Sequence, residues 1–503
     1  MKAFLLYRDR DFYWQQPPPP NEPDLVQDLE LHTLLDAMAG GDEFLWDTCR
    51  QVLVAGQKDD RDTILYRQAI LRDCLNHPDV IRGVYELAVQ TIETERREYW
   101  GLFSKYPAQI LRRSIDVLAM FVGALKKLRS VADEHAVSFA SEGLRTLCAT
   151  LQAEMSDEYF AQVEEHLKEL QFRRGVLISA RLGQGNKGAD YTLRQTPRPT
   201  GGLVQRLLGP RPESYGFRIA DRDEQGAKAL GELEERGINL VANAMAQSND
   251  HILSFFRLLR GELAFYVGGL NLHQKLTQLG EPVCFPEPAP LGEPRHAFRE
   301  LYDPCLALTT QARVVGNDAD GDGKHLVVIT GANQGGKTTF LRSIGVAQVM
   351  MQSGLFVAAE AFAANVVQGI FTHFKREEDA SMTSGKLDEE LSRMSTIADL
   401  VTPNSLILFN ESFAATNERE GSEIARQVVS ALLEWGIKVF FVTHQYEFAR
   451  GWYEGAREDS LFLRAERRED GERTFRLVEG KPLETSFGED LYDAVFGQDS
   501  AGR

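Results

Sequence analysis

The chain has 503 residues, of which 43% are hydrophobic and 26% charged, and it carries a formal net charge of −18 at pH 7. This length exceeds what one hydrophobic core supports, so we expect more than one domain. No apolar run approaches the roughly 20 residues of a membrane-spanning helix, and the start, MKAFLLYRDRDFYW, lacks the cleavage site of a signal peptide. The composition predicts a cytoplasmic protein without a membrane partner, in which nucleic-acid binding requires a local basic surface.

The first part of the chain is predicted to be mainly helical. Residues 1–28 are interpreted as an extended lead-in, because the tetraproline Pro17–Pro20 fits neither a helix interior nor a central strand. From about residue 29 apolar residues recur at spacings of three and four, as in DTILYRQAILRDCL, which predicts a helical core and lever domain over residues 29–280. Gly and Pro become frequent between Gly183 and Pro212, which predicts a small β-containing insertion at about residues 171–218 of that domain.

The last part of the chain is predicted to be an α/β domain. After the proline-rich boundary GEPVCFPEPAPLGEP, apolar runs typical of strands alternate with helical patterns, and these runs are HLVVITG, LFVAAEAF, SLILFNES and KVFFVTH. Such alternation favours a mostly parallel sheet. We therefore expect an ABC-like P-loop fold over residues 281–503.

A phosphate-binding loop is predicted between the strand VVIT and the helical pattern TFLRSIGVAQVMM. Gly331, Gly336, Lys337 and Thr338 fit the pattern GxxxxGK[ST], whose backbone N–H groups cradle phosphates at a helix N-terminus. Lys337 is expected to reach the β- and γ-phosphates of ATP, and the Thr338 hydroxyl to bind Mg²⁺. The predicted ATP contacts are Gly331, Ala332, Asn333, Gln334, Gly335, Gly336, Lys337, Thr338 and Thr339.

Polar residues end the two strands that follow the loop. SLILFNES ends in Asn410 and Glu411, where P-loop ATPases usually place a Mg²⁺-holding acid followed by a glutamate that orients the attacking water. Asn410 is an amide, so we expect weaker metal binding and slow hydrolysis. KVFFVTHQYEF ends in His444, at a position that can sense the γ-phosphate. Glu411, His444 and Lys337 are the predicted catalytic residues, and Thr338 and Asn410 the predicted metal ligands.

These motifs resemble the ATPase domain of MutS-type DNA mismatch-repair proteins. Asn333, the pair Gly335–Gly336 and the run from Glu411 to Gly421 match that family, strongly over about residues 296–496. YRQAILRDCL, within a weaker but collinear match over residues 60–280, is similar to the start of its helical core. The resemblance implies a homodimer in which a signature segment of each subunit, SMTSGKLDEELSRM with Ser384 and Glu390, completes the partner's ATP site.

Two features depart from that family. The helical core begins within the first 30 to 60 residues, which leaves no room for the family's N-terminal mismatch-reading and connector domains, so we do not expect mismatch recognition by its usual device. The signature segment keeps an acid at Glu390 but lacks the usual serine-rich spacing, which leaves open whether Ser384 or a neighbour reaches the partner's site.

Basic residues gather in the predicted insertion, where the resembled family carries its DNA-gripping clamp. The predicted DNA contacts are Arg173, Arg174, Arg181, Lys187 and Arg194. Such local enrichment supplies the phosphate contacts of sequence-independent binding, although a solvated basic loop would have the same composition.

Two functions therefore remain open. The first is a dimeric, DNA-associated ATPase of DNA repair or recombination. The second is an ATP-gated module that holds a protein partner, with little hydrolysis and no DNA binding.

Overall fold

The computed structural model describes residues 2–58, 60–99, 107–173, 175–186, 188–194, 215–216, 218–220, 222–332, 334–376, 385–455, 457–468 and 473–483. The chain divides into two compact units. Unit 1 comprises Met1–Ala3, Gly83–Ser138 and Arg145–Arg260, and unit 2 comprises Phe4–Arg82, Phe139–Leu144 and Gly261–Arg503. Among the described residues, no helix is long and apolar enough to span a bilayer. The domain boundaries at 28/29 and 280/281 stay a prediction.

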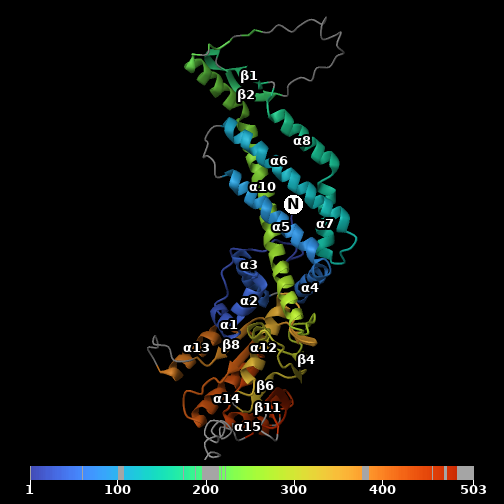
Figure 1. Cartoon of the computed structure of the whole chain (residues 1–503). Helices are drawn as coiled ribbons and strands as arrows, with labels where there is room; N and C mark the ends of the chain where they lie inside the picture. The colour runs from blue at the N-terminus through green and yellow to red at the C-terminus, as the bar shows by residue number, and fades with distance from the viewer. Residues whose placement is uncertain are drawn as a thin grey trace, which may run out of the picture. The chain divides into compact units, whose positions relative to one another are not determined.

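Unit 1 is built mostly from helices (Figure 1). Its elements are α5 (Pro78–Tyr99), α6 (Pro107–His135), α7 (Glu142–Glu154), α8 (Asp157–Leu170), β1 (Leu177–Leu182), the 3-10 turn η2 (Gln184–Asn186), β2 (Gly188–Arg194) and α10 (Glu224–Gln278), with the first residues of α5 and α7 and the last of α10 assigned to unit 2. In α6, apolar residues three and four apart form a buried stripe. Phe121 of this stripe stacks on Phe256 of α10 at 6.1 Å between ring centroids.

The strands β1 and β2 form an antiparallel hairpin within the segment where the sequence predicts strands. Leu177 pairs with Arg194 and Leu182 with Gly188, and the register shifts between Ser179 and Arg181. The hairpin packs on α10, because a Cβ added to Gly237 would lie 2.4 Å from Cδ1 of Ile178. Glycine at this position therefore permits the close approach of strand and helix.

Unit 2 joins the N-terminal helices to the C-terminal sheets. Its N-terminal elements are α1 (Glu22–Asp28), α2 (Leu31–Ala39), α3 (Glu43–Ala55), the 3-10 turn η1 (Gly56–Lys58) and α4 (Arg61–Asn76). Asp42 caps α3 by accepting from the backbone N–H groups of Phe44 and Leu45, and so satisfies donors that the helix cannot. The N-terminal helices are tied to the sheet region, since the Asn21 side chain donates to the Ile370 carbonyl at 2.6 Å.

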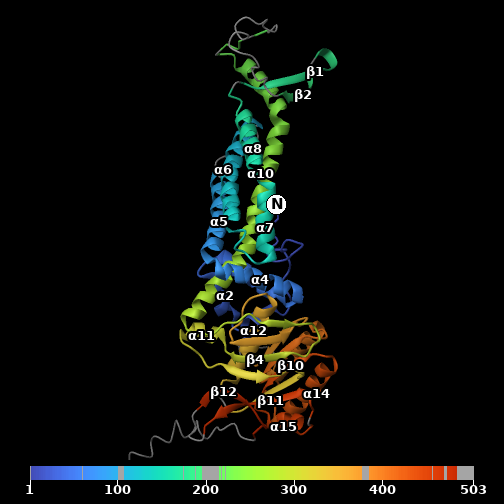
Figure 2. The same ribbon diagram turned by 90° about the vertical axis from the view of Figure 1, so that its right-hand side faces the viewer.

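The rest of unit 2 is a mixed α/β structure (Figure 2). Its strands are β3 (Glu287–Ala289), β4 (His296–Leu301), β5 (Asn317–Asp320), β6 (Leu326–Thr330), β7 (Ala361–Asn365), β8 (Ile370–Phe374), β9 (Leu406–Asn410), β10 (Lys438–Val442), β11 (Ser460–Arg467) and β12 (Arg473–Glu479). Its further helices are α11 (Pro304–Thr310), α12 (Lys337–Gln352), α13 (Lys386–Leu400), α14 (Glu418–Glu434) and α15 (Tyr446–Glu454).

The larger of its two sheets has the order β12-β11-β6-β10-β9-β8, and the smaller has the order β3-β7-β4-β5. All neighbours from β11 to β8 in the larger sheet are parallel, and β12 is antiparallel. The prediction of a helical region followed by an α/β region with parallel strands is confirmed in this general form. Because the carboxyl ends of parallel strands meet at one edge, the polar residues after β6, β9 and β10 come together there.

Helices cover both faces of the larger sheet, which explains its unbroken apolar strands. Ile407 and Phe409 of β9 pack in a buried cluster with residues of α13, α14 and α15. Leu408 points to the opposite face, where its Cδ1 would lie 2.7 Å from a Cβ on Gly345 of α12. Successive residues of β9 are therefore buried on opposite sides, which is typical of parallel sheets.

The N-terminal segment of unit 2 is held by a buried carboxylate. The backbone N–H groups of Leu5 and Phe12 donate to Glu262 of α10, at 2.6 Å and 3.4 Å. Glu262 is fully buried, and the Tyr266 hydroxyl one turn later donates to the Leu5 carbonyl. Burial raises the pKa of Glu262 from 4.5 to about 7, although its hydrogen bonds favour the charged form.

We expect the stability of the protein to fall as pH rises from about 5 to 8. The folded state holds the Glu262 proton more tightly than the unfolded state does. The stabilisation is therefore complete at pH values below the pKa of Glu262 in the unfolded state, and it is lost as the pH rises through its pKa in the folded state. A shift of this size corresponds to about 3 kcal/mol. Thermal unfolding at several pH values should show a smaller slope in Glu262→Gln, whereas Glu232→Gln, an exposed site on the same helix, should match the wild type. Equal slopes in all three proteins would contradict the assignment.

Candidate active site

The loop between β6 and α12 has a backbone that only glycine permits at two positions. Gly331 has φ 121° and Gly336 has φ 86°. A Cβ on Gly331 would lie 2.8 Å from the backbone nitrogen of Ala465 in β11, so the neighbouring strand also excludes a side chain. The loop leads directly into the N-terminus of α12, where free N–H groups and the helix dipole favour an anion.

Lys337 lies under this loop at the first position of α12. Its side chain is buried, and its Nζ donates to the carbonyl oxygens of Gly331 at 3.0 Å and Ala332 at 2.9 Å. Burial lowers the pKa of Lys337, and the nearby Glu411 carboxylate opposes that shift. The loop thus encloses a cation, and a cation in this position can bind the negatively charged oxygens of a polyphosphate chain.

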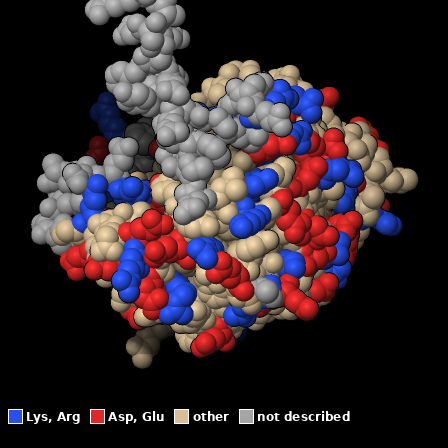
Figure 3. Space-filling model, turned by 90° about the horizontal axis from the view of Figure 1, so that it is seen from below, with Lys and Arg blue, Asp and Glu red and all other residues tan. Residues whose placement is uncertain are grey.

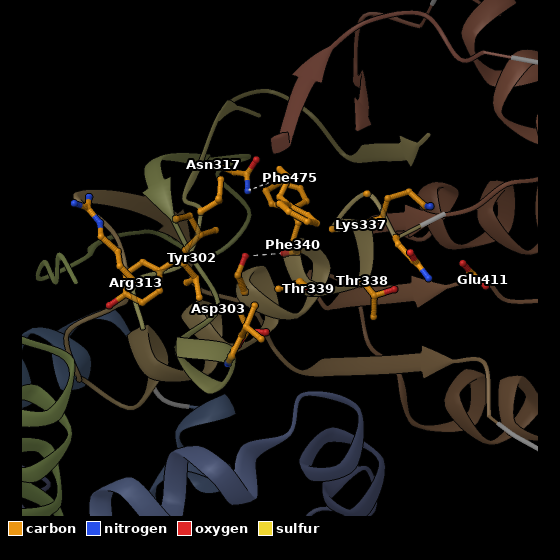
Figure 4. A pocket seen from close by; sticks show the side chains of 18 residues that line it. Tyr302, Asp303, Arg313, Asn317, Lys337, Thr338, Thr339, Phe340, Glu411 and Phe475 are labelled. Atoms are coloured by element: carbon orange, nitrogen blue, oxygen red, sulfur yellow. Dashed lines mark hydrogen bonds between the residues drawn. The ribbon is translucent and has the colours of Figure 1, made fainter. Parts of the chain in front are cut away.

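A cavity of about 440 Å³ opens beside the loop (Figure 4). One side is formed by the loop, the start of α12 and Glu411, and the other by residues from β4 to β5 and from β12. The residues labelled in Figure 4 are Tyr302, Asp303, Arg313, Asn317, Lys337, Thr338, Thr339, Phe340, Glu411 and Phe475. The volume falls within the range of small-molecule sites.

The sequence patterns did not predict the side of the cavity that lies opposite the phosphate loop. Phe475 of β12 is 49% exposed and lines the cavity. Asn317 of β5 holds this strand in place, because its side chain accepts from the Leu477 N–H at 2.7 Å and donates to the Phe475 carbonyl at 3.4 Å. No motif marks either residue; the sequence offers as a signal only an aromatic residue among charged ones in RTFRLVE.

Thr338 and Asn410 lie side by side at the sheet edge. The Thr338 hydroxyl donates to Oδ1 of Asn410 at 3.0 Å. Both offer oxygen, the ligand type that Mg²⁺ prefers, so these two residues fit the metal that the motif implies. Among the described residues there is no group of three or more His, Cys, Asp or Glu side chains that could hold a metal. Nucleotide phosphates and water would have to supply the other ligands.

Glu411 and His444 form a pair at the ends of β9 and β10. Nε2 of His444 lies 3.2 Å from Oε2 of Glu411. This hydrogen bond is the main cause that lowers the pKa of Glu411, and the positive charge of Lys337 adds to it. The carboxylate therefore stays ionised at neutral pH beside the phosphate loop, where it can accept a hydrogen bond from water.

The predicted signature residues are placed only in part. Ser384 lies outside the described residues, and so does Asn333 of the loop. Glu390 of α13 is 6% exposed, its Oε2 has no hydrogen-bond partner among the described residues, and the nearby Phe413 N–H of the same chain favours its charged form. Burial raises the pKa of Glu390. A role of this segment in a partner's site stays a prediction.

The predicted DNA contacts belong to unit 1, whereas the residues that line the cavity belong to unit 2. Arg173, Arg181 and Arg194 are exposed at the hairpin, whereas Arg174 and Lys187 lie outside the described residues. The Arg181 guanidinium lies 4.0 Å from Asp190, and Arg194 donates to the Ser179 hydroxyl at 2.9 Å. Acidic and basic side chains are mixed on the face shown in Figure 3, which presents no large basic patch among the described residues in view.

Comparison with known proteins identifies two matching families. Residues 59–279 match the MutS2 N-terminal domain, and residues 327–494 match MutS domain V. The DNA mismatch repair protein MutS of Leptospira interrogans is 26% identical over 305 residues, which are 59% of this chain and 34% of that protein. Endonuclease MutS2 of Lacticaseibacillus casei is 31% identical over 190 residues, 37% of this chain and 23% of that protein.

A mammalian relative also matches this chain over part of its length. MutS protein homolog 4 of Mus musculus is 29% identical over 257 residues, 50% of this chain and 25% of that protein. The chain thus spans about a third or less of the length of these relatives. Both family matches lie in order along the chain, and the second contains the phosphate loop, Glu411 and His444. The chain belongs to the MutS family.

Proposed function

We propose that this protein binds ATP with Mg²⁺ and hydrolyses it slowly in an ABC-like P-loop site. The observation that carries this proposal is the cavity lined by both the loop cation Lys337 and the ionised Glu411, whose carboxylate is held by His444. A cation and N–H donors at one end and a carboxylate near them suit phosphoryl transfer to water.

Each residue has a distinct task in this proposal. The loop N–H groups and Lys337 bind the β- and γ-phosphates, Glu411 orients the attacking water, and His444 holds Glu411 in place. Mg²⁺ would neutralise phosphate charge beside Thr338 and Asn410. Asn410 contributes an oxygen without a charge, which supports slow turnover.

The base of the nucleotide is proposed to lie on the far side of the cavity. Phe475 exposes about half of its surface there, and aromatic side chains offer a stacking face to a purine. The Tyr302 side chain forms part of the same wall. This orientation places the phosphates toward the loop and the base toward β12.

ATP use is proposed to serve DNA binding by a homodimer in the cytoplasm, in a repair or recombination process. Support comes from the family and from the exposed arginines of the hairpin. A second function, an ATP-gated module for a protein partner with no DNA binding, is favoured by the absence of an acid at Asn410 and by the closeness of Asp190 to Arg181.

Salt titration of DNA binding separates the two functions. Replacing Arg173, Arg181 and Arg194 together with Ala should weaken duplex binding and reduce the salt slope by about 0.9 for each lost phosphate contact. Three exposed arginines on helices of the same unit, Arg97, Arg112 and Arg145, provide the matched control triple. No DNA binding by the wild type would favour the protein-partner function, and equal losses in both triples would move the DNA surface away from the hairpin.

A further inference from the structure

A buried polar cluster lies behind the turn that carries Glu411. His373 of β8 and Ser412 are fully buried, and Glu390 of α13 is 6% exposed. Nδ1 of His373 lies 2.7 Å from the Ser412 hydroxyl, and its Nε2 lies 3.0 Å from the Glu390 carbonyl oxygen. The sequence suggested no function for His373 or Ser412.

The partners of His373 determine which ring nitrogen carries the proton. Burial lowers the pKa of His373 to about 4, so the ring is neutral at pH 7. A carbonyl oxygen only accepts, so Nε2 is the nitrogen that donates to Glu390. The Ser412 hydroxyl contacts His373 twice, because it lies 2.7 Å from Nδ1 and donates to the His373 backbone carbonyl at 2.6 Å. The ring therefore joins α13 to the residue directly after Glu411, in one orientation.

The turn itself has a backbone that needs such support. Glu411 has φ 54° and Phe413 has φ 61°, and both are non-glycine residues in the left-handed region. This conformation costs free energy and persists only where surrounding contacts impose it. The contacts are those of the Ser412 hydroxyl with Nδ1 and the carbonyl oxygen of His373, and that of the Phe413 carbonyl, which accepts from Gln445 at 3.0 Å. The Glu390 carboxylate lies near the Phe413 N–H, which favours its charged form.

Packing restricts the same turn further. The His373 ring stacks on the Phe413 ring at 5.3 Å between centroids, with 22° between their planes. A Cβ on Gly421 of α14 would lie 2.3 Å from the Phe413 oxygen, so the first turns of α14 close the other side. Glu411, at the start of this turn, has little freedom except in its own side chain.

We infer that His373 and Glu390 are positioning residues for Glu411 of the same subunit, which hold the turn of Glu411, Ser412 and Phe413 in the strained form that aims the carboxylate at the attacking water. The inference rests on the proposed ATP hydrolysis. Neither residue touches the nucleotide cavity, since neither is among its lining residues. His373 acts through its ring contact with Ser412, and Glu390 acts through its carbonyl oxygen on that ring and through its carboxylate near the Phe413 N–H.

The first test uses His373→Phe, which keeps the ring and its packing but removes both hydrogen bonds. We expect kcat for ATP hydrolysis to fall about tenfold or more, because small displacements of a catalytic group are costly. KM and the ATP dissociation constant should stay within about twofold of the wild type, because the phosphate loop is unchanged. A merely structural histidine would leave kcat unchanged in a folded His373→Phe protein, and that result would overturn the inference.

The second test separates hydrogen bonding from charge at position 390. Glu390→Ala should reduce kcat, whereas Glu390→Gln keeps an acceptor for the Phe413 N–H and should restore most of it. Asp399→Ala, at an exposed site on the same helix and outside the signature segment, is the control. Equal activity of Glu390→Ala and the control would contradict the inference.

A third measurement does not depend on hydrolysis. Amide hydrogen exchange in a peptide containing Phe413 should be faster in Glu390→Ala than in Glu390→Gln or the wild type. Faster exchange together with an inactive wild type would reject the proposed hydrolysis but leave the positioning contact in place. Unchanged exchange would reject the positioning contact, whatever the wild-type activity.

Discussion

Lys337→Ala is expected to weaken ATP binding by about a hundredfold or more. Lys337 is the buried cation enclosed by the loop, and its Nζ already lies within 3.0 Å of two loop carbonyl oxygens. Hydrogen bonds to charged groups each contribute about 1.5 to 3 kcal/mol, and two of them to a polyphosphate correspond to a factor of about 10² to 10⁴. Alanine supplies neither charge nor donor.

Calorimetric titration with ATP at constant Mg²⁺ measures this loss directly. Lys481→Ala removes an exposed lysine of the same unit and should bind ATP as the wild type does. Thermal unfolding should be compared as well, because the substitution also frees the carbonyl groups of Gly331 and Ala332. If a folded Lys337→Ala protein binds ATP within about threefold of the wild type, the loop is not the phosphate site.

Glu411→Gln is expected to trap bound ATP. Glutamine keeps the shape of the side chain and an oxygen that can accept from His444, but it has no charge with which to orient and polarise water. We expect single-turnover hydrolysis to fall by about a hundredfold or more, in the usual range for loss of acid–base assistance. The ATP dissociation constant should change by less than about threefold, because the phosphate contacts are intact.

The matched control is Glu447→Gln, an exposed site in the first turn of α15. It should hydrolyse ATP at the wild-type rate. Hydrolysis by Glu411→Gln at more than about a third of the wild-type rate would show that another group orients the water. Loss of ATP binding in Glu411→Gln would instead mean that the carboxylate helps to hold the nucleotide or its metal.

Local patterns predicted the strands and the loop because both follow from short-range chemistry. VVIT, LILF and KVFFV are uninterrupted apolar runs, and the structure makes each of them a strand buried on both faces. The glycines of TGANQGGKT were expected where backbone approaches phosphate, and Gly331 and Gly336 have the positive φ values that exclude other residues. The roles of the loop residues, Glu411 and His444 stay predictions that the geometry supports.

The sequence does not predict which residues pack against the buried side of a helix. Periodicity shows that α4 has a buried side, but not that Arg67 on this side is fully buried and donates to the Leu6 carbonyl at 2.8 Å. The lead-in was expected to be extended, yet α1 begins at Glu22, because Pro23 occupies the first helical turn, where its missing N–H has no cost. Phe475 and Asn317 meet through side-chain hydrogen bonds between strands of two different sheets, 158 residues apart in the chain, which no motif records.

Glu390 is another residue whose surroundings the sequence does not predict, although it lies within a motif. Its place in SMTSGKLDEELSRM suggested a residue that reaches a partner, and its carboxylate turns inward to the Phe413 N–H of its own chain. An acidic residue in a helical pattern is usually solvent-exposed, and only the fold reveals that this one is buried beside the strained turn.

The attachment of the N-terminal helices to the C-terminal sheet has a consequence for biosynthesis. Asn21 donates to a carbonyl 349 residues further along the chain, and Gln352 at the end of α12 donates to the Gln57 carbonyl at 2.9 Å, 295 residues away. A ribosome adds about 5 to 20 residues per second, so the apolar faces of α1 to α4 wait tens of seconds for their partners. During that time they are exposed to misassociation, and contacts so distant in sequence form slowly. We therefore expect folding of the nascent chain to depend on chaperones more than the size of unit 2 alone would require.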